Sequence, residues 1–294
     1  MPLSEAHCPI LVTGAAGLLG HDLGPLLAAG ATDPSAVHLT DVADLDVTDA
    51  SAVGSAMDRL RPRTVINLAG WTDVDGAERH PAEARRLNAH AADLLARAAA
   101  KAGALLVHMS TDFVFGGARA GPYVEADPPR PQGVYAQTKA DGEASVRHAA
   151  PDRHLIVRTA WMYGAGGPNF VDAVLDRARR GRPLRVVTDQ VGCPTWSADL
   201  ARAMVAMLAA ELRGTVHACG AGEASRWALA AEALRAAGIE RMPEKITTAD
   251  LPQGGAPRPA RAVLSCERLA REAGFRFPPW QESVRRYVQG GGAG

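Results

Sequence analysis

The first half of the chain alternates short apolar runs with longer Ala-rich stretches in which apolar residues recur with a helical period. The apolar runs predict strands at residues 9–13, 37–40, 64–68, 105–108 and 155–157. The stretches between them predict helices that begin near Leu18, Asp49, Ala82 and Tyr135. Strands that alternate with helices are typical of a parallel, doubly wound sheet with helices on both faces. We therefore predict an α/β fold of the Rossmann type, with ligands bound at the carboxyl ends of the strands.

The alternation becomes looser after about residue 160. A Gly-rich loop is predicted at 164–168, followed by a helix over 170–180, a strand over 184–187 and a helix over 197–212. Residues 252–259 are rich in Pro and Gly and predict an ordered loop or flap, and a short helix follows at 267–273. We predict a dinucleotide-binding domain over 1–160 with later segments threading back, a smaller C-terminal substrate lobe formed mainly by 161–289, and a disordered tail at 290–294.

Composition narrows the classes of function. Positive and negative residues balance at 32 each over 294 residues, which argues against a protein that coats nucleic acid or an anionic membrane. The chain lacks a run of ~20 apolar residues, and its first residues lack the pattern of a signal peptide. The four cysteines form no C-x-x-C pair, which favours reduced thiols. We expect a cytoplasmic protein that binds neither nucleic acid nor membrane.

A glycine-rich loop follows the first predicted strand, with the sequence Thr-Gly-Ala-Ala-Gly-Leu-Leu-Gly over 13–20. Gly14 permits a tight turn, Gly17 lets backbone amides approach a pyrophosphate, and Gly20 lets the helix pack close to the strand. The amino end of the following helix directs N–H dipoles at the anion. The loop predicts a dinucleotide site.

Asp41 ends the second predicted strand, 21 positions after Gly20. A carboxylate there hydrogen-bonds the ribose hydroxyls of NAD and repels a 2′-phosphate, and Val42 beside it offers no cation for that phosphate. This position favours NADH over NADPH. Further along, Thr48 or Asp49 is a helix N-cap, and Asp46 can reach the adenine side.

Tyr135 and Lys139 are four residues apart, which places a phenol and an amine on one helix face. A phenol titrates near pH ~10, and a nearby ammonium lowers its pKa. Lowering the pKa of the phenol by ~3 units to neutral pH takes roughly 4 kcal/mol of stabilisation of the phenolate relative to the phenol. Thr111 follows the strand predicted at 105–108, and its hydroxyl can polarise a substrate carbonyl or simply cap a turn. The three side chains predict proton and hydride chemistry at a carbonyl.

Together these motifs resemble the extended short-chain dehydrogenase/reductases and, more narrowly, the dTDP-4-dehydrorhamnose reductase family. The matching segments span nearly the whole chain, at 13–20, 45–49, 65–75, 110–115, 135–143, 158–164, 189–195 and 257–259. The resemblance implies NADH- or NADPH-dependent reduction of the C4 ketone of a dTDP-4-keto-6-deoxysugar, most of all dTDP-4-dehydro-L-rhamnose. It assigns proton delivery to Tyr135, tuning of Tyr135 and contact with the nicotinamide ribose to Lys139, and carbonyl polarisation to Thr111.

The resemblance also implies binding residues. Cofactor contacts, including those inferred above from the residues alone, are expected at Gly14, Gly17, Leu18, Leu19, Gly20, Asp41, Asp46, Val47, Gly70, Trp71, Thr72, Tyr135 and Lys139. Substrate contacts are expected at Thr111, Asp112, Tyr135 and Trp161, the last through packing of its ring on the apolar face of a deoxysugar. Asn88 matches a position that orders the site around the lysine in the wider superfamily, although a solvated helix Asn is an alternative.

Some members of the family bind magnesium at a dimer interface through acidic side chains. The matching positions here are Asp22 and Ala198, and alanine cannot ligate a metal. We therefore expect no metal, and a homodimer stays open.

Three alternatives compete with this interpretation. The first is a nucleotide-sugar 4,6-dehydratase or epimerase; a dehydratase of this fold has a glutamate after the Thr-Asp pair, but this chain has Phe113 there. A 4-ketoreductase for a different dTDP-deoxysugar of an antibiotic pathway shares every motif. A non-catalytic regulatory subunit with the same fold is disfavoured by the intact Thr111, Tyr135 and Lys139.

Overall fold

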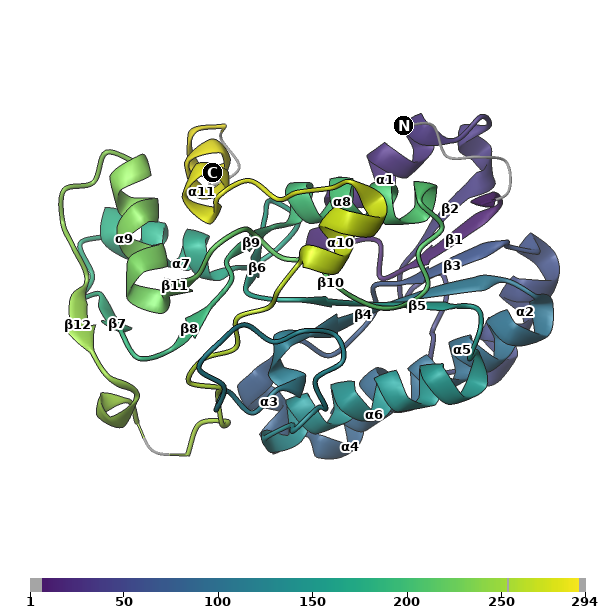
Figure 1. Ribbon diagram of the computed structural model, residues 1–294, viewed down its shortest axis with the longest axis horizontal. Coiled ribbons are helices and arrows are strands. Elements are labelled where there is room, and N and C mark those ends of the chain that lie inside the picture. Colours follow the sequence, from purple (N-terminus) through teal and green to yellow (C-terminus); the bar gives the residue numbers. More distant parts are fainter. Residues whose placement is uncertain (1–6, 253, 291–294) are drawn as a thin grey trace.

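The computed structural model describes residues 7–252 and 254–290, and its centre is a six-stranded parallel sheet (Figure 1). The strands are β1 (Ile10–Thr13), β2 (Val37–Thr40), β3 (Thr64–Asn67), β4 (Leu105–Thr111), β5 (His154–Thr159) and β10 (Gly214–His217). They run in the order β10-β5-β4-β3-β1-β2, and every pairing is parallel. The predicted doubly wound α/β fold is confirmed. The order reverses between β1 and β3, which is where a ligand crevice is expected.

All five strands predicted from the apolar runs are present, and β4 and β5 are longer than predicted. The sixth strand, β10, was missed because Gly-Thr-Val-His contains no apolar run. It forms a strand because its backbone pairs with β5 from Gly214↔Leu155 to His217↔Arg158. Tertiary pairing here decides the structure of a segment whose own sequence does not.

Helices cover both faces of the sheet (Figure 1). One face carries α1 (Leu18–Gly30), α8 (Ser197–Ala209) and α10 (Glu267–Ala273), and the other carries α2 (Ala50–Leu60), α5 (Ala91–Ala102) and α6 (Gly133–Ala149). Leu23 and Leu27 of α1 are fully buried in the same cluster as Met204 of α8. Each such side chain contributes about 1.5–3 kcal/mol through burial. A helix from the second half of the chain therefore completes the core around the first strand.

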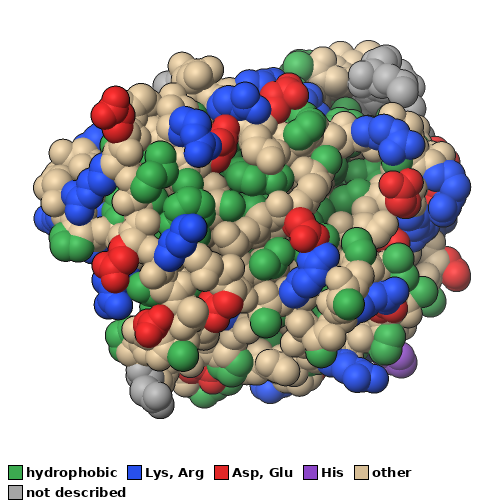
Figure 2. All heavy atoms as spheres, turned by 60° about the vertical axis from the view of Figure 1, so that its left-hand side comes forward, with side chains coloured by type: hydrophobic (Ala, Val, Ile, Leu, Met, Phe, Trp, Pro, Cys, Tyr) green, Lys and Arg blue, Asp and Glu red, His purple; other side chains and the backbone are tan. Residues whose placement is uncertain are grey.

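Several of the elements that follow β5 form a lobe with its own apolar core. Its helices are α7 (Phe170–Arg179), α9 (Arg226–Ala236) and α11 (Trp280–Gln289), and the last two were not predicted. Its strands pair two by two, β7 (Arg185–Val187) with β12 (Glu244–Ile246), β8 (Val191–Gly192) with β11 (Ala224–Ser225), and β6 (Met162–Tyr163) with β9 (Thr195–Trp196). Acidic and basic side chains are interspersed on the face of the lobe in Figure 2, in keeping with the balanced charge.

Helix boundaries follow the local signals in part. Asp49 caps α2, and its Oδ1 accepts hydrogen bonds from the backbone N of Ser51 at 2.8 Å and of Ala52 at 3.2 Å. The helix predicted from near Ala82 is divided into α4 (Pro81–Arg85), a π-helical turn η3 (Arg86–His90) and α5, with α3 (Val74–Arg79) before them. Short 3₁₀ turns complete the chain at η2 (Pro34–Ala36), η4 (Asp112–Val114) and η5 (Thr248–Asp250).

Several predictions made on whole segments stay predictions. The limits 1–160 and 161–289 of the two predicted domains are not tested by the arrangement of the elements. Gly290 directly follows α11, and residues 291–294 of the predicted tail lie outside the described residues. The predicted helix over 197–212 ends earlier, with α8 at Ala209.

Within the part of the chain that the structure describes, every helix is too short or too polar to cross a membrane.

Candidate active site

The glycine loop lies at the reversal point of the sheet, between the ends of β1 and β3. Gly14 has φ +68°, and a Cβ added to it would lie 2.6 Å from the backbone N of Ala69. A Cβ on Gly20 would lie 2.2 Å from the carbonyl O of Ala15. Both positions therefore require glycine. Leu19 is buried in the core, so only its backbone can face a cofactor.

Asp41 and Asp46, which were expected beside the cofactor, both point at backbone amides. Asp41 Oδ2 accepts a hydrogen bond from the N of Ala16 in the glycine loop at 2.9 Å. Asp46 Oδ1 accepts hydrogen bonds from the N and Oγ1 of Thr48 at 2.8 and 2.7 Å, and these bonds lower the Asp46 pKa. Val47 beside it is buried, so its backbone alone is available to a ligand. The Asp41 carboxylate lies against the loop that is predicted to hold the pyrophosphate.

Asn88 holds the segment of Gly70 and Trp71 in place. Its Oδ1 accepts a hydrogen bond from Trp71 N at 2.8 Å, while its Nδ2 donates to Trp71 O at 3.2 Å and to Thr138 Oγ1 at 3.1 Å. Asn88 is 1% exposed and lies in the π-helical turn, so the alternative of a solvated helix Asn is wrong. A Cβ on Gly142 of α6 would lie 2.3 Å from Asn88 O, which shows how closely α6 packs on this turn.

Thr111, Tyr135 and Lys139 gather at the carboxyl end of β4. Lys139 Nζ donates a hydrogen bond to the carbonyl O of Met109 at 2.6 Å. Thr111 Oγ1 accepts a hydrogen bond from Phe113 N at 3.2 Å and donates to Asp112 Oδ1 at 3.0 Å, and its side chain also interacts with the Tyr135 phenol. The hydroxyl of Thr111 therefore caps η4 and faces the phenol at the same time.

The pKa values of the pair differ from the sequence expectation. Burial raises the pKa of Tyr135 to about 12, Thr111 opposes this rise, and the charge of Asp112 adds to it. The expectation that Lys139 lowers the Tyr135 pKa is wrong for the protein alone, because the ammonium is directed at Met109 O. Burial lowers the pKa of Lys139 to about 8, against the opposing charge of Glu143. At pH 7 the phenol is protonated and the amine carries its charge.

Asp112 places a carboxylate beside this group. It is 1% exposed, and burial raises its pKa to about 7 although Thr111 and Arg226 favour its charged form. Its Oδ2 has no hydrogen-bond partner among the described residues, which leaves one acceptor open to a ligand hydroxyl. Phe113 occupies the following position and meets the Tyr135 ring edge to face at 5.5 Å between centroids.

Trp161 has a left-handed backbone with φ +44°, which is unusual for a bulky residue. A Cβ on Gly192 would lie 2.5 Å from its ring, so the ring packs directly on the Gly192 backbone. The guanidinium of Arg226 lies over the ring, with Cζ 3.7 Å from the centroid. Sequence reasoning missed Arg226. The Arg226 guanidinium therefore covers one side of the Trp161 ring. The predicted contact of this ring with a deoxysugar stays untested.

The Pro- and Gly-rich segment predicted as a loop is tied to the sheet domain. Arg258 donates from Nη1 and Nη2 to the two carboxylate oxygens of Asp75 at 3.1 and 2.7 Å, and Ala256 N donates to Asp75 Oδ1 at 2.9 Å. A Cβ on Gly133, at the start of α6, would lie 3.0 Å from Pro257 Cδ. The segment thus covers the end of the helix that carries Tyr135.

Glu143 anchors the back of the site one turn below Lys139. Its Oε1 accepts hydrogen bonds from Ser110 Oγ at 2.6 Å and Arg158 Nε at 2.8 Å, and its Oε2 accepts from Arg158 Nη2 at 2.7 Å and Arg147 Nη2 at 2.5 Å. Glu143 and Arg158 are fully buried. Burial raises the pKa of Glu143, but the hydrogen bonds from Arg158 and Ser110 and the charges of Arg158 and Arg147 together lower it to about 2. This network fixes α6 against β4 and β5.

We expect Glu143→Gln to destabilise the fold in a pH-dependent way. The folded pKa lies below the usual 4.5, so the stabilisation is present above about pH 4.5 and is lost as the pH falls toward 2. The shift corresponds to roughly 3 kcal/mol at neutral pH, within the range for breaking a buried ion pair. Urea unfolding of the variant and of the unmutated protein at pH 7 and pH 3 measures this difference in the free energy of unfolding. The exposed Glu244→Gln should cost under about 1 kcal/mol, and an equal pH dependence for Glu143→Gln and the unmutated protein would contradict the argument.

The positions matched to a family metal site make other contacts. Asp22 Oδ2 accepts a hydrogen bond from Ser197 Oγ, and Ala198 follows in α8. Within residues 7–252 and 254–290, no group of three His, Cys, Asp or Glu side chains is placed to hold a metal ion. The expected absence of a metal stays a prediction.

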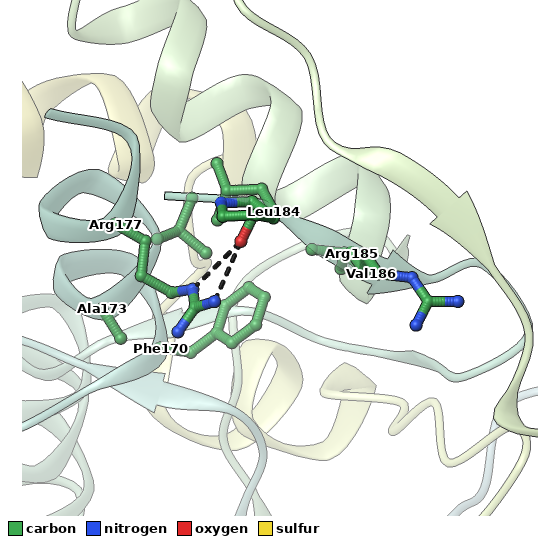
Figure 3. Close-up of a pocket in the computed structure, with 8 residues that line it drawn as sticks. Phe170, Ala173, Arg177, Leu184, Arg185 and Val186 are labelled. Carbon is green, nitrogen blue, oxygen red and sulfur yellow. Dashed lines mark hydrogen bonds between the residues drawn. The ribbon is translucent and has the colours of Figure 1, made fainter. Parts of the chain in front are cut away.

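A groove of about 250 Å³ lies between α7 and β7 (Figure 3). Phe170, Val174 and Leu184 line it, and Arg177 donates hydrogen bonds to Pro183 O at its rim. None of the residues predicted for catalysis or binding lines it. The groove is a surface feature between packed elements of the lobe and is separate from the candidate catalytic residues at the end of β4.

Comparison with known proteins identifies relatives of this arrangement. Residues 8–291 match the family model described as RmlD substrate binding domain. The chain is 43% identical over 263 residues, 88% of this chain and 86% of the relative, to a dTDP-4-dehydrorhamnose reductase of Streptomyces griseus. It is 40% identical, over 94% of this chain and 92% of the relative, to a probable dTDP-4,6-dihydroxy-2-methyloxan-3-one 4-ketoreductase of Streptomyces antibioticus. The crystal structure of a dTDP-4-dehydrorhamnose reductase of Bacillus anthracis in complex with NADP superimposes with a TM-score of 0.90, at 31% identity and coverage of 96% and 98%.

Proposed function

This chain belongs to the RmlD substrate binding domain family and is an NAD(P)H-dependent oxidoreductase of the dTDP-4-dehydrorhamnose reductase type, and we propose that it reduces dTDP-4-dehydro-L-rhamnose to dTDP-L-rhamnose. The coarser activity is that of a 4-ketoreductase of dTDP-deoxysugars. The observation that carries the proposal is the gathering of Thr111, Tyr135 and Lys139 beside the open acceptor of Asp112. These four residues are the proposed catalytic and substrate-binding group.

The glycine loop fits a dinucleotide, since Gly14 and Gly20 leave no room for side chains beside β3 and α1. Its backbone amides, with the segment of Gly70 and Trp71 that Asn88 fixes, would hold the cofactor. When bound, the reduced nicotinamide supplies the hydride. Lys139, near the Gly70 backbone, would contact the nicotinamide ribose.

The side chains then act on the carbonyl. Thr111 donates a hydrogen bond to the ketone oxygen and polarises it, which requires its hydroxyl to turn from Asp112. Tyr135 is protonated at neutral pH because burial raises its pKa to about 12, so it can deliver a proton to the oxygen as negative charge develops there. The charged Lys139 would stabilise the phenolate that remains, which requires its ammonium to turn from Met109 O. Phe113 stands where a dehydratase of this fold has its glutamate base, which favours simple reduction over dehydration.

A second candidate function is 4-ketoreduction of a different dTDP-deoxysugar, and a relative at 40% identity favours keeping it. Turnover with a panel of dTDP-4-keto-6-deoxysugars, with the C4 configuration of each product determined, separates the two. The highest kcat/KM for dTDP-4-dehydro-L-rhamnose supports the proposal, and a higher value for another sugar of the panel would replace it. A homodimer and a cytoplasmic location stay predictions.

We expect the protein to prefer NADH and Asp41→Ala to narrow that preference. The Asp41 carboxylate lies on the glycine loop and would repel a 2′-phosphate, and charged hydrogen bonds of this kind are worth about 1.5–3 kcal/mol. The ratio of kcat/KM for NADH to that for NADPH should fall about tenfold in the variant. Asp33→Ala, at the N-cap of η2, should leave this ratio unchanged. Equal kcat/KM values for both cofactors in the unmutated protein would refute the role of Asp41.

A further inference from the structure

Arg226 is the first residue of α9, and its guanidinium reaches from the lobe into the candidate site. The group lies over the Trp161 ring, 3.7 Å from Cζ to the centroid, and 5.1 Å from the centroid of Phe170. Its side chain makes no hydrogen bond and no ion pair at salt-bridge distance with any residue in the described parts of the chain. Arg226 is half-buried and none of its nitrogens is buried without a partner, so its donors face solvent and are available to a ligand.

Arg226 interacts with the charges of nearby residues without forming a hydrogen bond to them. The carboxylate of Asp112 attracts it and the guanidinium of Arg258 repels it, while burial lowers its pKa to about 10, so it stays charged at pH 7. Arg258 is itself held by Asp75. Of the two guanidiniums, Arg226 alone has no hydrogen-bonded carboxylate among the described residues, so its donors can bind an anionic group of a ligand.

The distance of 3.7 Å from Arg226 Cζ to the Trp161 centroid is that of a guanidinium in contact with the ring face. A guanidinium that stacks on an aromatic ring uses its face, and its five N–H donors project in the plane around the edge. Such an edge matches the oxygens of a phosphate, which it can bind through two parallel hydrogen bonds. Trp161, whose ring packs against the Gly192 backbone, is therefore a rigid support for these donors.

We propose that Arg226 anchors the sugar-linked phosphate of the substrate's diphosphate. The inference rests on the proposed function, which places the sugar at Asp112 and Trp161. The phosphate is bonded directly to the sugar ring, so a guanidinium beside these two residues is within reach of it. Holding that phosphate fixes the sugar relative to Tyr135, which makes Arg226 a binding and specificity residue contributed by the lobe.

Calorimetric titration with dTDP and with dTMP tests the proposal, because dTMP lacks the phosphate to which the sugar is linked. The unmutated protein should bind dTDP about tenfold to a hundredfold more tightly than dTMP. Arg226→Met should abolish this advantage and leave dTMP binding within about threefold. Arg226→Lys should restore part of it, because a point charge replaces a planar donor group. Arg185→Met, the same change on an exposed strand of the lobe, serves as the control.

Three outcomes would overturn the inference. The unmutated protein could bind both nucleotides equally, Arg226→Met could keep the dTDP advantage, or it could weaken both nucleotides alike, as a general disturbance of the lobe would. The proposed function is judged separately by turnover. The unmutated protein could fail to turn over every keto sugar while Arg226→Met still loses the tighter binding of dTDP. That result would refute the proposed function and support the role of Arg226 in binding the phosphate.

Discussion

Tyr135→Phe should lower kcat by about 10²–10⁴-fold while leaving the affinity for NADH nearly unchanged. The substitution removes only the phenolic O–H, and the ring that meets Phe113 edge to face is retained. Because the phenol is protonated at neutral pH, its loss removes the proton donor itself rather than a tuning charge. Steady-state turnover with the preferred keto sugar and fluorescence titration with NADH give the two quantities.

Tyr163→Phe is the matched control for this experiment. Tyr163 is buried in the core of the lobe, and its hydroxyl has no hydrogen-bond partner among the described residues. Its removal should leave kcat within about twofold, as for a group outside the reaction. Retention of more than a third of the activity by Tyr135→Phe would show that another group delivers the proton.

The sheet and the glycine loop were predictable because their signals are local. Buried parallel strands are continuous apolar runs, as in β1, in which all four residues are buried. The phenol and amine of α6 are adjacent on a helix and could be paired by spacing alone. For α11 a signal was also present, since Trp280, Val284 and Tyr287 are buried at helical spacing.

The rest of the site depends on contacts between distant segments. Arg226 meets Trp161 and Asp112 only after the lobe has folded onto the sheet, and no local pattern marks an arginine whose donors will stay unpaired. In the same way, the Sγ atoms of Cys219 and Cys266 lie 3.5 Å apart although no spacing rule pairs them. The predicted lowering of the Tyr135 pKa was wrong for a related reason. Helical spacing puts Lys139 near Tyr135, but burial and the direction of the ammonium toward Met109 O decide the charge balance.

Lys139→Met should lower both kcat and the affinity for NADH, in contrast to Tyr135→Phe. We expect kcat to fall at least about 10²-fold, because the phenolate left after proton delivery loses the ammonium that is proposed to turn toward it. The Kd for NADH should rise about tenfold through the lost contact with the ribose. Lys101→Met, at the exposed end of α5, is the control and should change neither value.

The pH profile gives an independent test of Lys139. Burial lowers its pKa to about 8, so the ammonium is lost as the pH rises through that value, and kcat/KM of the unmutated enzyme should decline there. The Tyr135 pKa of about 12 is too high to produce this decline. Lys139→Met should have a low kcat/KM without a descending limb near pH 8. If the limb persists in the variant, another group titrates there and the charge of Lys139 is not what supports proton delivery.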